Sequence, residues 1–242
     1  MSYKIMQFTK EQDWHDYHRN KIGGSMASAV LSMNPWKTNV QAWREITGLK
    51  GGKSPISNQE AVDYGVKAEP LLRQLFQLDN INKYKVYDPL SGYTVLYNDE
   101  YPYMIGTLDG TLEAIADIDF ELDNGTKIHI EKGEKGVLEI KTANLLSVSS
   151  KEKWKEQIPN NYYIQVLHYL IVTGYKFAIL HAQLKYQDGD DSWTTRKSYF
   201  IDRASNEESI KVLMEREKEF YEKYIKTGIE PPLVMVAMDT VE

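Results

Sequence analysis

The chain has 242 residues, a formal net charge of −6, 42% hydrophobic and 12% aromatic residues, and no cysteine. This length suits one large or two small domains, and the apolar content is sufficient for a full core, which excludes a disordered chain. The absence of cysteine excludes disulfides, thiolate metal sites and iron–sulfur clusters. The polar N-terminus predicts no signal peptide and no apolar run is long enough to span a membrane, so we expect a cytoplasmic protein.

The negative net charge counts against DNA binding, because contacts to phosphate dominate that affinity. Net charge does not determine the local field, however. Acidic residues gathered at a metal site and on outer faces are compatible with a basic groove elsewhere. The charge therefore leaves nucleic acid open as a ligand.

Hydrophobic periodicity predicts a helical N-terminal part, a central part rich in strands, and a C-terminal helix. The predicted helices cover residues 8–20, a segment that begins at Ser25, and residues 38–46, 57–76, 160–173 and 205–224. The predicted strands are 85–87, 93–97, 103–108, 111–116, 127–130, 137–141, 176–185 and 193–201. We expect an antiparallel meander that widens into the main sheet, with an acidic solvated hairpin at 117–125. Pro70 is expected to kink its helix or to begin a second one.

Helix starts are predicted from side chains that can accept a bond from a free backbone amide. The expected capping residues are Thr9, Ser25, Thr38, Ser57 and Ser205. Ser25 follows two glycines and has two interpretations: a plain N-cap, or part of a site where helix amides hold a phosphate. Residues 50–55 are expected to form a mobile connection. The tail, 231–242, is expected to be an edge strand or a segment docked on a neighbouring subunit.

The residues with the clearest chemical potential lie on the predicted strand 137–141. Alternation places Glu139 and Lys141 on one face, while Leu138 and Ile140 can enter the core from the other. A carboxylate beside an ammonium suits metal-assisted attack on phosphate. The carboxylate holds a divalent cation, and the lysine orients or deprotonates water, or balances the growing charge. The same pattern also arises as a solvated charge pair on a half-exposed strand.

Two flanking motifs favour the chemical interpretation. Asp109 ends an apolar run directly before Gly110, and Gln165 lies on a predicted helix with His168 and Tyr169 near the same face. An aspartate, then Glu-x-Lys, then a helix that carries a glutamine is the pattern of the PD-(D/E)XK nuclease core. We interpret His168 as a core or interface residue.

Five motifs together resemble the YqaJ-type viral recombinase family, which is related to phage lambda exonuclease, over roughly residues 15–185. In chain order they are Ile22-Gly23-Gly24-Ser25, Asn34-Pro35-Trp36, Gly106-Thr107-Leu108-Asp109-Gly110, Leu138-Glu139-Ile140-Lys141-Thr142 and Tyr163-x-Gln165-x-x-x-Tyr169. The resemblance implies an α/β (α+β) fold with a PD-(D/E)XK core, in which helices flank a central mixed β-sheet. It implies one domain over 1–242, with its catalytic core at about 60–185, a DNA-binding helical part at about 8–56, and a C-terminal helix and tail at 205–242.

The function that the resemblance implies is a 5′→3′ exonuclease that degrades one strand of duplex DNA from an end. It would leave a 3′ overhang for a single-strand annealing protein. The family also implies two Mg²⁺ ions, or Mn²⁺ in their place, a homotrimeric ring, and the cytoplasm of a bacterial host of a phage or prophage. A ring would reconcile the negative total charge with a basic lumen. The alternatives are an endonuclease of restriction or repair type on the same core and a non-catalytic DNA-binding module.

The resemblance assigns roles to the residues that match its active-site motifs. Asp109 and Glu139 would be metal ligands, with the backbone carbonyl of Ile140 as a further ligand, and Lys141 would be the catalytic lysine. Glu69 matches a helical glutamate that assists at the metal site, through the run Gly65-x-x-x-Glu69-Pro70.

The remaining roles concern the helix glutamine and the DNA end. Gln165 matches a helix glutamine near the active site. Ser25 and Arg19 match residues that hold the terminal 5′-phosphate, with Lys21 as the alternative to Arg19. The long interval between Asp109 and Glu139 departs from the family, and we expect it to be surface decoration.

Overall fold

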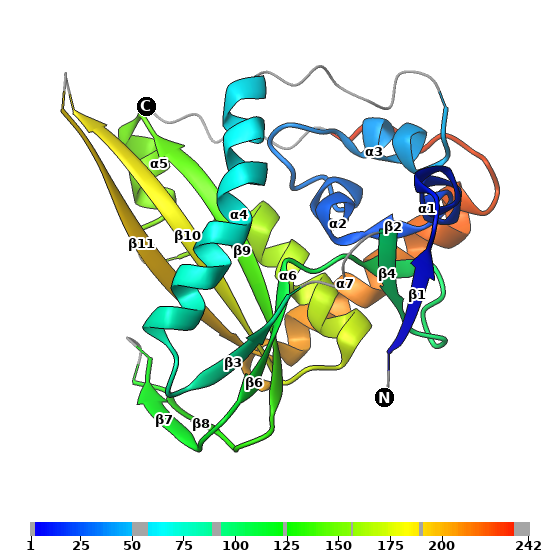
Figure 1. Cartoon of the computed structure of the whole chain (residues 1–242). Coiled ribbons are helices and arrows are strands. Elements are labelled where there is room, and N and C mark those ends of the chain that lie inside the picture. Colours follow the sequence, from blue (N-terminus) through cyan, green and yellow to red (C-terminus); the bar gives the residue numbers. More distant parts are fainter. Residues whose placement is uncertain are drawn as a thin grey trace.

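The computed structural model describes residues 3–49, 58–88, 93–122, 125–155, 157–188 and 191–234. Their strands form a five-stranded sheet, a four-stranded sheet and a two-stranded hairpin (Figure 1). The α-helices are α1 (Glu11–His18), α2 (Gly24–Val30), α3 (Asn39–Ile46), α4 (Gln59–Asp79), α5 (Val148–Lys153), α6 (Asn160–Thr173) and α7 (Glu207–Phe220). A π-helical turn at Tyr221–Ile225 follows α7 directly.

The five-stranded sheet is mixed and has β9 at its centre. Its order is β11 (Asp191–Asp202), β10 (Phe177–Asp188), β9 (Lys135–Leu145), β6 (Gly110–Ala114) and β3 (Tyr84–Tyr87). Only the β9–β10 pair is parallel within this sheet, and α5 and α6 make the crossover that a parallel pair requires. The predicted mixed sheet flanked by helices is therefore confirmed.

The sequence did not predict the four-stranded sheet, and the prediction of a single antiparallel meander that widens into the main sheet is wrong. This sheet has the order β1 (Lys4–Phe8), β4 (Tyr93–Tyr97), β5 (Met104–Gly106) and β2 (Ile22–Gly23). Alternation identifies a strand but not its partner, so nothing local assigned β4 and β5 to a separate sheet. The hairpin of β7 (Ile118–Glu121) and β8 (Lys127–Ile130) also pairs only with itself.

Both faces of β9 are covered by helices. Leu138 and Ile140 pack in one cluster with Leu72 and Phe76 of α4. Val137 points to the opposite face, into the larger cluster that includes α6 and α7. Fully burying a side chain of this kind contributes roughly 1.5–3 kcal/mol. The predicted alternation is confirmed, but no face of β9 is left half-exposed at its centre, because α6 lies between the two sheets and contacts β9, β4 and β5.

The predicted helix caps have mixed outcomes. Thr38 is a cap, because its Oγ1 accepts from the Gln41 amide at 3.2 Å in a reciprocal capping box. Thr9 is not, since Phe8 pairs with Tyr93 in β1 and the helix begins only at Glu11. Here the pairing of an extended segment outweighed a local capping signal.

The other caps are shifted along the chain. Gly23 rather than Ser25 precedes α2, because β2 runs directly into that helix. Asn58 caps α4 by accepting from the Ala61 amide at 3.0 Å, and Ser57 lies outside the described residues. Ser205 donates to Asp202 instead, and α7 begins at Glu207.

Pro70 lies inside α4, which runs without interruption on both sides of it. Proline inside a helix costs roughly 3 kcal/mol, so the expectation was a kink or a second helix. No second helix begins there, because the apolar face of α4 packs on the sheet both before and after the proline, at Ala68, Leu72 and Phe76.

The described part of the tail is not a strand. The Asn39 side chain donates to the Pro232 carbonyl at 2.8 Å and accepts from the Val234 amide at 3.1 Å, so this segment lies against α3. The expectations for residues 50–55 and for the rest of the tail, 235–242, fall outside the described residues.

Candidate active site

A buried polar cluster lies where β9 faces α6. Glu139 is completely buried, with 0% of the residue exposed. Its Oε1 accepts from Lys141 Nζ at 2.5 Å and from Gln165 Nε2 at 2.8 Å. Lys141 comes from the same face of the strand, and Gln165 from the facing side of the helix. Strand alternation had placed Glu139 and Lys141 on one face, and the order of the motifs had linked Gln165 to them. The structure joins all three through the Glu139 carboxylate.

The second carboxylate oxygen of Glu139 is unusual. Oε2 is buried, and it has no hydrogen-bond partner among the described residues. Buried polar atoms are almost always bonded, because an unpaired one costs free energy. An unsatisfied carboxylate oxygen beside a lysine therefore indicates a position at which a ligand completes the site.

Asp109 reaches the same strand from the connection between the two sheets. The last residue pair of β6 and β9 on this side is Gly110 with Leu138, so no residue of β6 stands opposite Ile140. The Asp109 side chain takes that place, and its Oδ2 accepts from the Ile140 amide at 2.9 Å. The amide and carbonyl of one strand residue point to the same side, so the Ile140 carbonyl also faces Asp109.

Glu69 joins the cluster from α4 through an arginine that sequence reasoning missed. Arg73 is buried, and its Nη1 donates to Glu69 Oε1 at 3.0 Å and to the Asp109 carbonyl at 2.7 Å, while its Nε donates to Asp88 at 2.6 Å. Gly110 leaves room for it, since a Cβ there would stand 3.3 Å from Arg73 Cδ. The available signal was the four-residue spacing of Glu69 and Arg73 on one helix.

Tyr169 connects this cluster to α2. Gln165 Nε2 also donates to the Tyr169 hydroxyl at 3.1 Å, and the tyrosine ring packs against Gly24 at the start of α2. A Cβ on Gly24 would stand 2.4 Å from Tyr169 Cε1, so only glycine fits there. This contact gives Gly24 a packing role and places Ser25, which is exposed, one residue away from it.

Negative charge is concentrated in the cluster. Burial and the nearby Asp109 raise the pKa of Glu139 above its ordinary value, and Lys141 only partly opposes them. Burial likewise raises the pKa of Glu69, with Asp109 adding to the effect. Burial acts to lower the pKa of Lys141, but the charges of Glu139 and Asp109 outweigh it and the net shift is upward. Additional positive charge would therefore stabilise the ionised carboxylates.

A divalent cation fits the donors on this side of β9. Within the described part of the chain, no group of three or more Asp, Glu, His or Cys side chains is arranged to hold a metal by itself. The possible ligands here are the carboxylates of Asp109 and Glu139, the latter with its unpaired Oε2, and the backbone carbonyl of Ile140. All are hard oxygen donors, and Mg²⁺ commonly binds to few protein groups and retains several waters.

The residues proposed for the 5′-phosphate are not joined to the carboxylates by direct contacts. Arg19 pairs loosely with Asp16, Nε to Oδ1 at 3.5 Å, and its side chain is exposed. Lys21 donates to the Tyr17 carbonyl at 2.8 Å and lies over the Tyr17 ring, so its ammonium is already engaged. Of the two, Arg19 is the more accessible.

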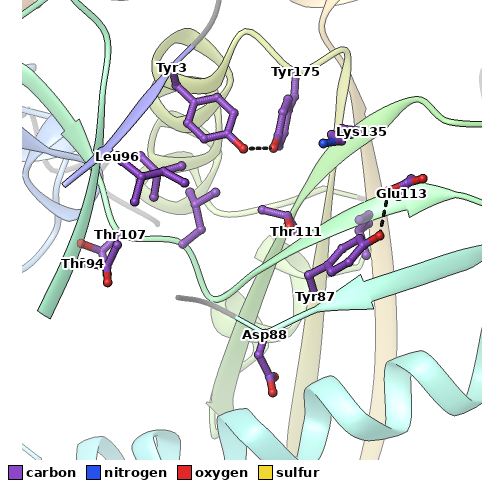
Figure 2. Close-up of a pocket in the computed structure, with 13 residues that line it drawn as sticks. Tyr3, Tyr87, Asp88, Thr94, Leu96, Thr107, Thr111, Glu113, Lys135 and Tyr175 are labelled. Carbon is purple, nitrogen blue, oxygen red and sulfur yellow. Dashed lines mark hydrogen bonds between the residues drawn. The ribbon is translucent and has the colours of Figure 1, made fainter. Parts of the chain in front are cut away.

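A cavity of about 310 Å³ lies between the two sheets, next to the segment that carries Asp109 (Figure 2). Thr107 and Leu108 line it, but the cluster around Glu139 does not. The Tyr3 and Tyr175 hydroxyls meet at 2.6 Å on one side of it. This space is a neighbour of the site and not part of it.

His168 belongs to a second buried pair on α6. Its Nδ1 lies 2.9 and 3.1 Å from the two carboxylate oxygens of Glu217, and its Nε2 lies 2.9 Å from the Ile105 carbonyl. Both ring nitrogens face acceptors, and this arrangement favours the doubly protonated ring. The interpretation of His168 as a core residue is confirmed by its complete burial.

The fold is that of exonucleases of known structure. An alkaline exonuclease from Laribacter hongkongensis, LHK-Exo, matches with a TM-score of 0.55 at 16% sequence identity, covering 90% of this chain and 94% of that chain. A phage-related exonuclease from Haemophilus somnus 129PT matches with a TM-score of 0.51 at 12% identity, covering 88% and 99%. At these identities the likeness establishes the fold.

The family follows from the sequence. Residues 13–176, more than half of the chain, match the YqaJ-like viral recombinase domain, and the chain belongs to that family. The uncharacterised protein YqaJ of Bacillus subtilis (strain 168) is 26% identical over 220 residues, covering 90% of this chain and 54% of that protein. This chain thus spans about half the length of that curated relative. In the described residues, no helix is both long and apolar enough to cross a bilayer.

Proposed function

We propose that the chain is a metal-dependent nuclease that hydrolyses phosphodiester bonds from the ends of duplex DNA in the 5′→3′ direction. The observation that carries the proposal is the buried, unpaired Oε2 of Glu139, beside Lys141 and on the strand that Asp109 contacts. A nuclease of the Glu-x-Lys type needs this set of groups. The fold shared with the exonucleases and the family membership support the same activity.

Each residue has a definite task in this proposal. Asp109, Glu139 and the Ile140 carbonyl would hold two Mg²⁺ ions, or Mn²⁺ in their place. The bound cation supplies Lewis-acid activation of water and stabilisation of the leaving oxygen. Lys141 orients the attacking water or balances charge on the phosphate, and Gln165 holds the Glu139 carboxylate in position. Glu69, held by Arg73, supports the site from α4.

Ser25 and Arg19 are proposed to hold the terminal 5′-phosphate. Ser25 is exposed in the first turn of α2, which packs on Tyr169 and so on the Glu139 cluster. The product, a 3′ overhang, would be bound by a single-strand annealing protein. A homotrimeric ring around DNA would concentrate basic surface in its lumen while the total charge stays negative. A cytoplasmic location in a bacterial host is proposed with this activity.

The experiment is digestion of linear duplex DNA labelled separately at its 5′ and 3′ ends, with Mg²⁺ and with EDTA. Metal-dependent release of the 5′ label first, with a closed circular control intact, is the expected result. A nicked circle would show an endonuclease, and no cleavage with either Mg²⁺ or Mn²⁺ would leave only a DNA-binding module. Removing the 5′-phosphate should slow digestion, and equal rates would contradict the phosphate pocket.

A further inference from the structure

Trp36 is a large exposed side chain in a loop that is held by side-chain hydrogen bonds. Its residue is 63% exposed, yet its amide donates to Asn34 Oδ1 at 2.9 Å, and Asn34 Nδ2 donates to the buried Ser28 Oγ at 2.9 Å. A single exposed tryptophan is not in itself unusual. Here, however, the Asn34-Pro35-Trp36 motif fixes where the indole stands, and none of the roles proposed above uses that indole.

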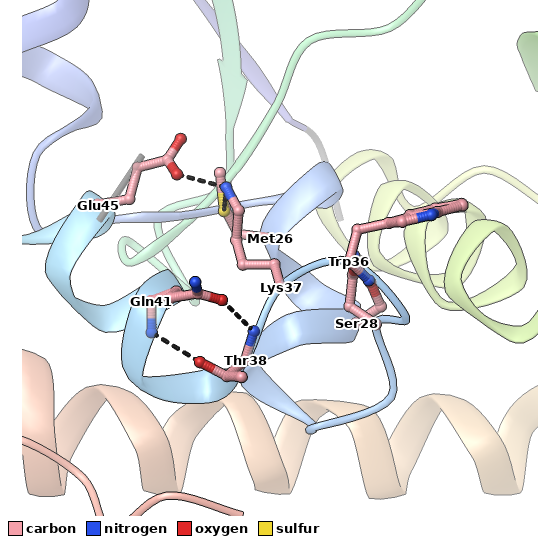
Figure 3. A network of polar contacts seen from close by, with 8 residues as sticks. Met26, Ser28, Trp36, Lys37, Thr38, Gln41 and Glu45 are labelled. Atoms are coloured by element: carbon pink, nitrogen blue, oxygen red, sulfur yellow. Dashed lines mark hydrogen bonds and ion pairs between the residues drawn. The ribbon is translucent and has the colours of Figure 1, made fainter. Parts of the chain in front are cut away.

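The residues that follow Trp36 are held inward. Figure 3 shows Lys37 turned back to pair with Glu45 and to contact Met26 Sδ at 3.6 Å, while Thr38 caps α3. The Trp36 side chain extends the other way in the same view, toward the neighbouring helix. In this loop the Trp36 ring is therefore exposed to solvent, whereas the Lys37 ammonium is paired with Glu45.

Trp36 stands next to the proposed active site. Its ring centroid is 6.2 Å from that of Tyr162, on the first turn of α6, with the planes tilted at 44°. Lys141 Nζ lies 5.3 Å from the centroid of the same Tyr162 ring. Tyr162 is also supported by the buried ring of Trp154, centroid to centroid at 5.5 Å. One tyrosine thus separates the exposed indole from Lys141.

Lysines accompany the two rings that support Trp36, with Lys141 over Tyr162. Lys153 and Lys155 flank Trp154 in sequence, and both are exposed. An exposed ring one tyrosine away from Lys141, adjoining a carboxylate site for phosphate chemistry, suits a ligand with flat faces and negative charges. Nucleic-acid strands have both, and sites for single strands combine aromatic stacking platforms with basic surface. A purely apolar protein partner would not use the lysines.

We propose that Trp36, supported by Tyr162, is a stacking platform for an unpaired base of the strand that enters the active site. The inference rests on the proposed nuclease function and deepens it. Stacking places the nucleotide next to Lys141 and makes no demand on base identity, since every base has a π face. Trp36 is therefore a positioning residue that holds the strand and takes no part in the chemical step.

The test measures the binding of a 5′-phosphorylated, fluorescein-labelled duplex by anisotropy in EDTA, which prevents cleavage. Trp36→Ala should weaken binding by about 5- to 150-fold, the range for losing one stacked base, and Trp36→Phe should retain most of the affinity. Trp193→Ala is the matched control, because Trp193 is also exposed, at 46%, but stacks on Tyr186 in the β10–β11 hairpin. It should bind nearly as wild type.

A second arm removes the base instead of the residue. Duplexes with an abasic nucleotide at the first, second or third position of the 5′ strand are titrated against wild type and Trp36→Ala. At one position the abasic duplex should weaken wild type but add little to the variant, because the partner is already missing. Additive losses at all three positions, or normal binding by a folded Trp36→Ala, would overturn the stacking role. A wild-type protein that neither binds nor digests DNA ends would instead overturn the proposed function itself.

Discussion

Helix α6 contributes to two clusters with a buried carboxylate, and the two carboxylates differ in their hydrogen bonding. His168 pairs with Glu217, and every polar atom of that pair has a partner. Gln165, one turn earlier on the helix, bonds to Glu139, whose Oε2 has none in the described structure. Glu139 and Glu217 are both completely buried, and each pairs with a basic side chain. Completeness of hydrogen bonding separates them.

This difference distinguishes a structural pair from a binding site. A buried ion pair is tolerated when its groups satisfy one another, and then it joins elements, here α6 to α7. A buried carboxylate with a free oxygen destabilises the isolated protein, and such a defect persists where a ligand makes use of it. The comparison predicts opposite consequences for two chemically identical substitutions.

Glu139→Gln should have the largest effect on activity. It removes a proposed metal ligand, and losing several kcal/mol of cation-based stabilisation lowers the cleavage rate by about 10³-fold. The thermal stability of the metal-free protein should be unchanged or higher, because the substitution removes one of several neighbouring negative charges while Asp109 still faces Lys141. Initial digestion rates and melting temperatures measure the two quantities. A marked loss of metal-free stability would show that Glu139 is a structural residue.

Glu217→Gln is the matched substitution in the other cluster. Removing one charge of a buried pair typically costs about 3–5 kcal/mol, so urea should unfold this variant at much lower concentration. Cleavage per folded molecule should be close to that of wild type. A variant that is stable but inactive would place Glu217 in the active site. The two carboxylates would then not differ in function.

Lys141→Ala is expected to slow cleavage by about 10²- to 10³-fold, the cost of removing one positioned electrostatic donor from a reacting centre. DNA binding in EDTA should be retained. Lys135→Ala is the control, since Lys135 lies on the same face of the same strand but is exposed. Cleavage by Lys141→Ala at the normal rate would show that its assigned role is wrong.

The sequence was informative about β9 and silent about what surrounds it. Alternation correctly placed Glu139 and Lys141 on one face, and the ordered motifs identified the family and hence the fold. Sequence reasoning could not predict that α6 would cover that face. Which helix packs on a strand face is decided by long-range contacts, and these have no local sequence pattern. Arg73 was missed for the same reason: two of its partners, Asp88 and the Asp109 carbonyl, lie on other segments.

Arg73→Gln should weaken metal binding by about 10- to 100-fold, as for other residues that orient metal ligands. Glu69 and the Asp109 backbone would both lose a buried charged donor. Mn²⁺ titration followed by electron paramagnetic resonance measures this without any need for activity. Arg73→Lys should recover little, because lysine lacks the fork that reaches several acceptors. Arg196→Gln, which breaks an exposed 3.4 Å pair with Asp79, should leave Mn²⁺ affinity unchanged.

The smallest expected effect is a change in how stability depends on pH, and it concerns His168. Burial acts to lower the pKa of this ring, but the Glu217 charge and the bonds to Glu217 and to the Ile105 carbonyl outweigh it, so the pKa lies above the ordinary 6.5. A histidine with a raised pKa in the folded state stabilises the protein fully below pH 6.5 and loses that contribution as the pH rises through the folded-state pKa.

Urea unfolding of wild type between about pH 6 and pH 9 should therefore show a decline that His168→Gln lacks, since a neutral amide donates to Glu217 at every pH. The two proteins should differ most in the free energy of unfolding at the acidic end of this range and converge toward the alkaline end. Parallel curves would mean that the His168–Glu217 pair does not titrate there.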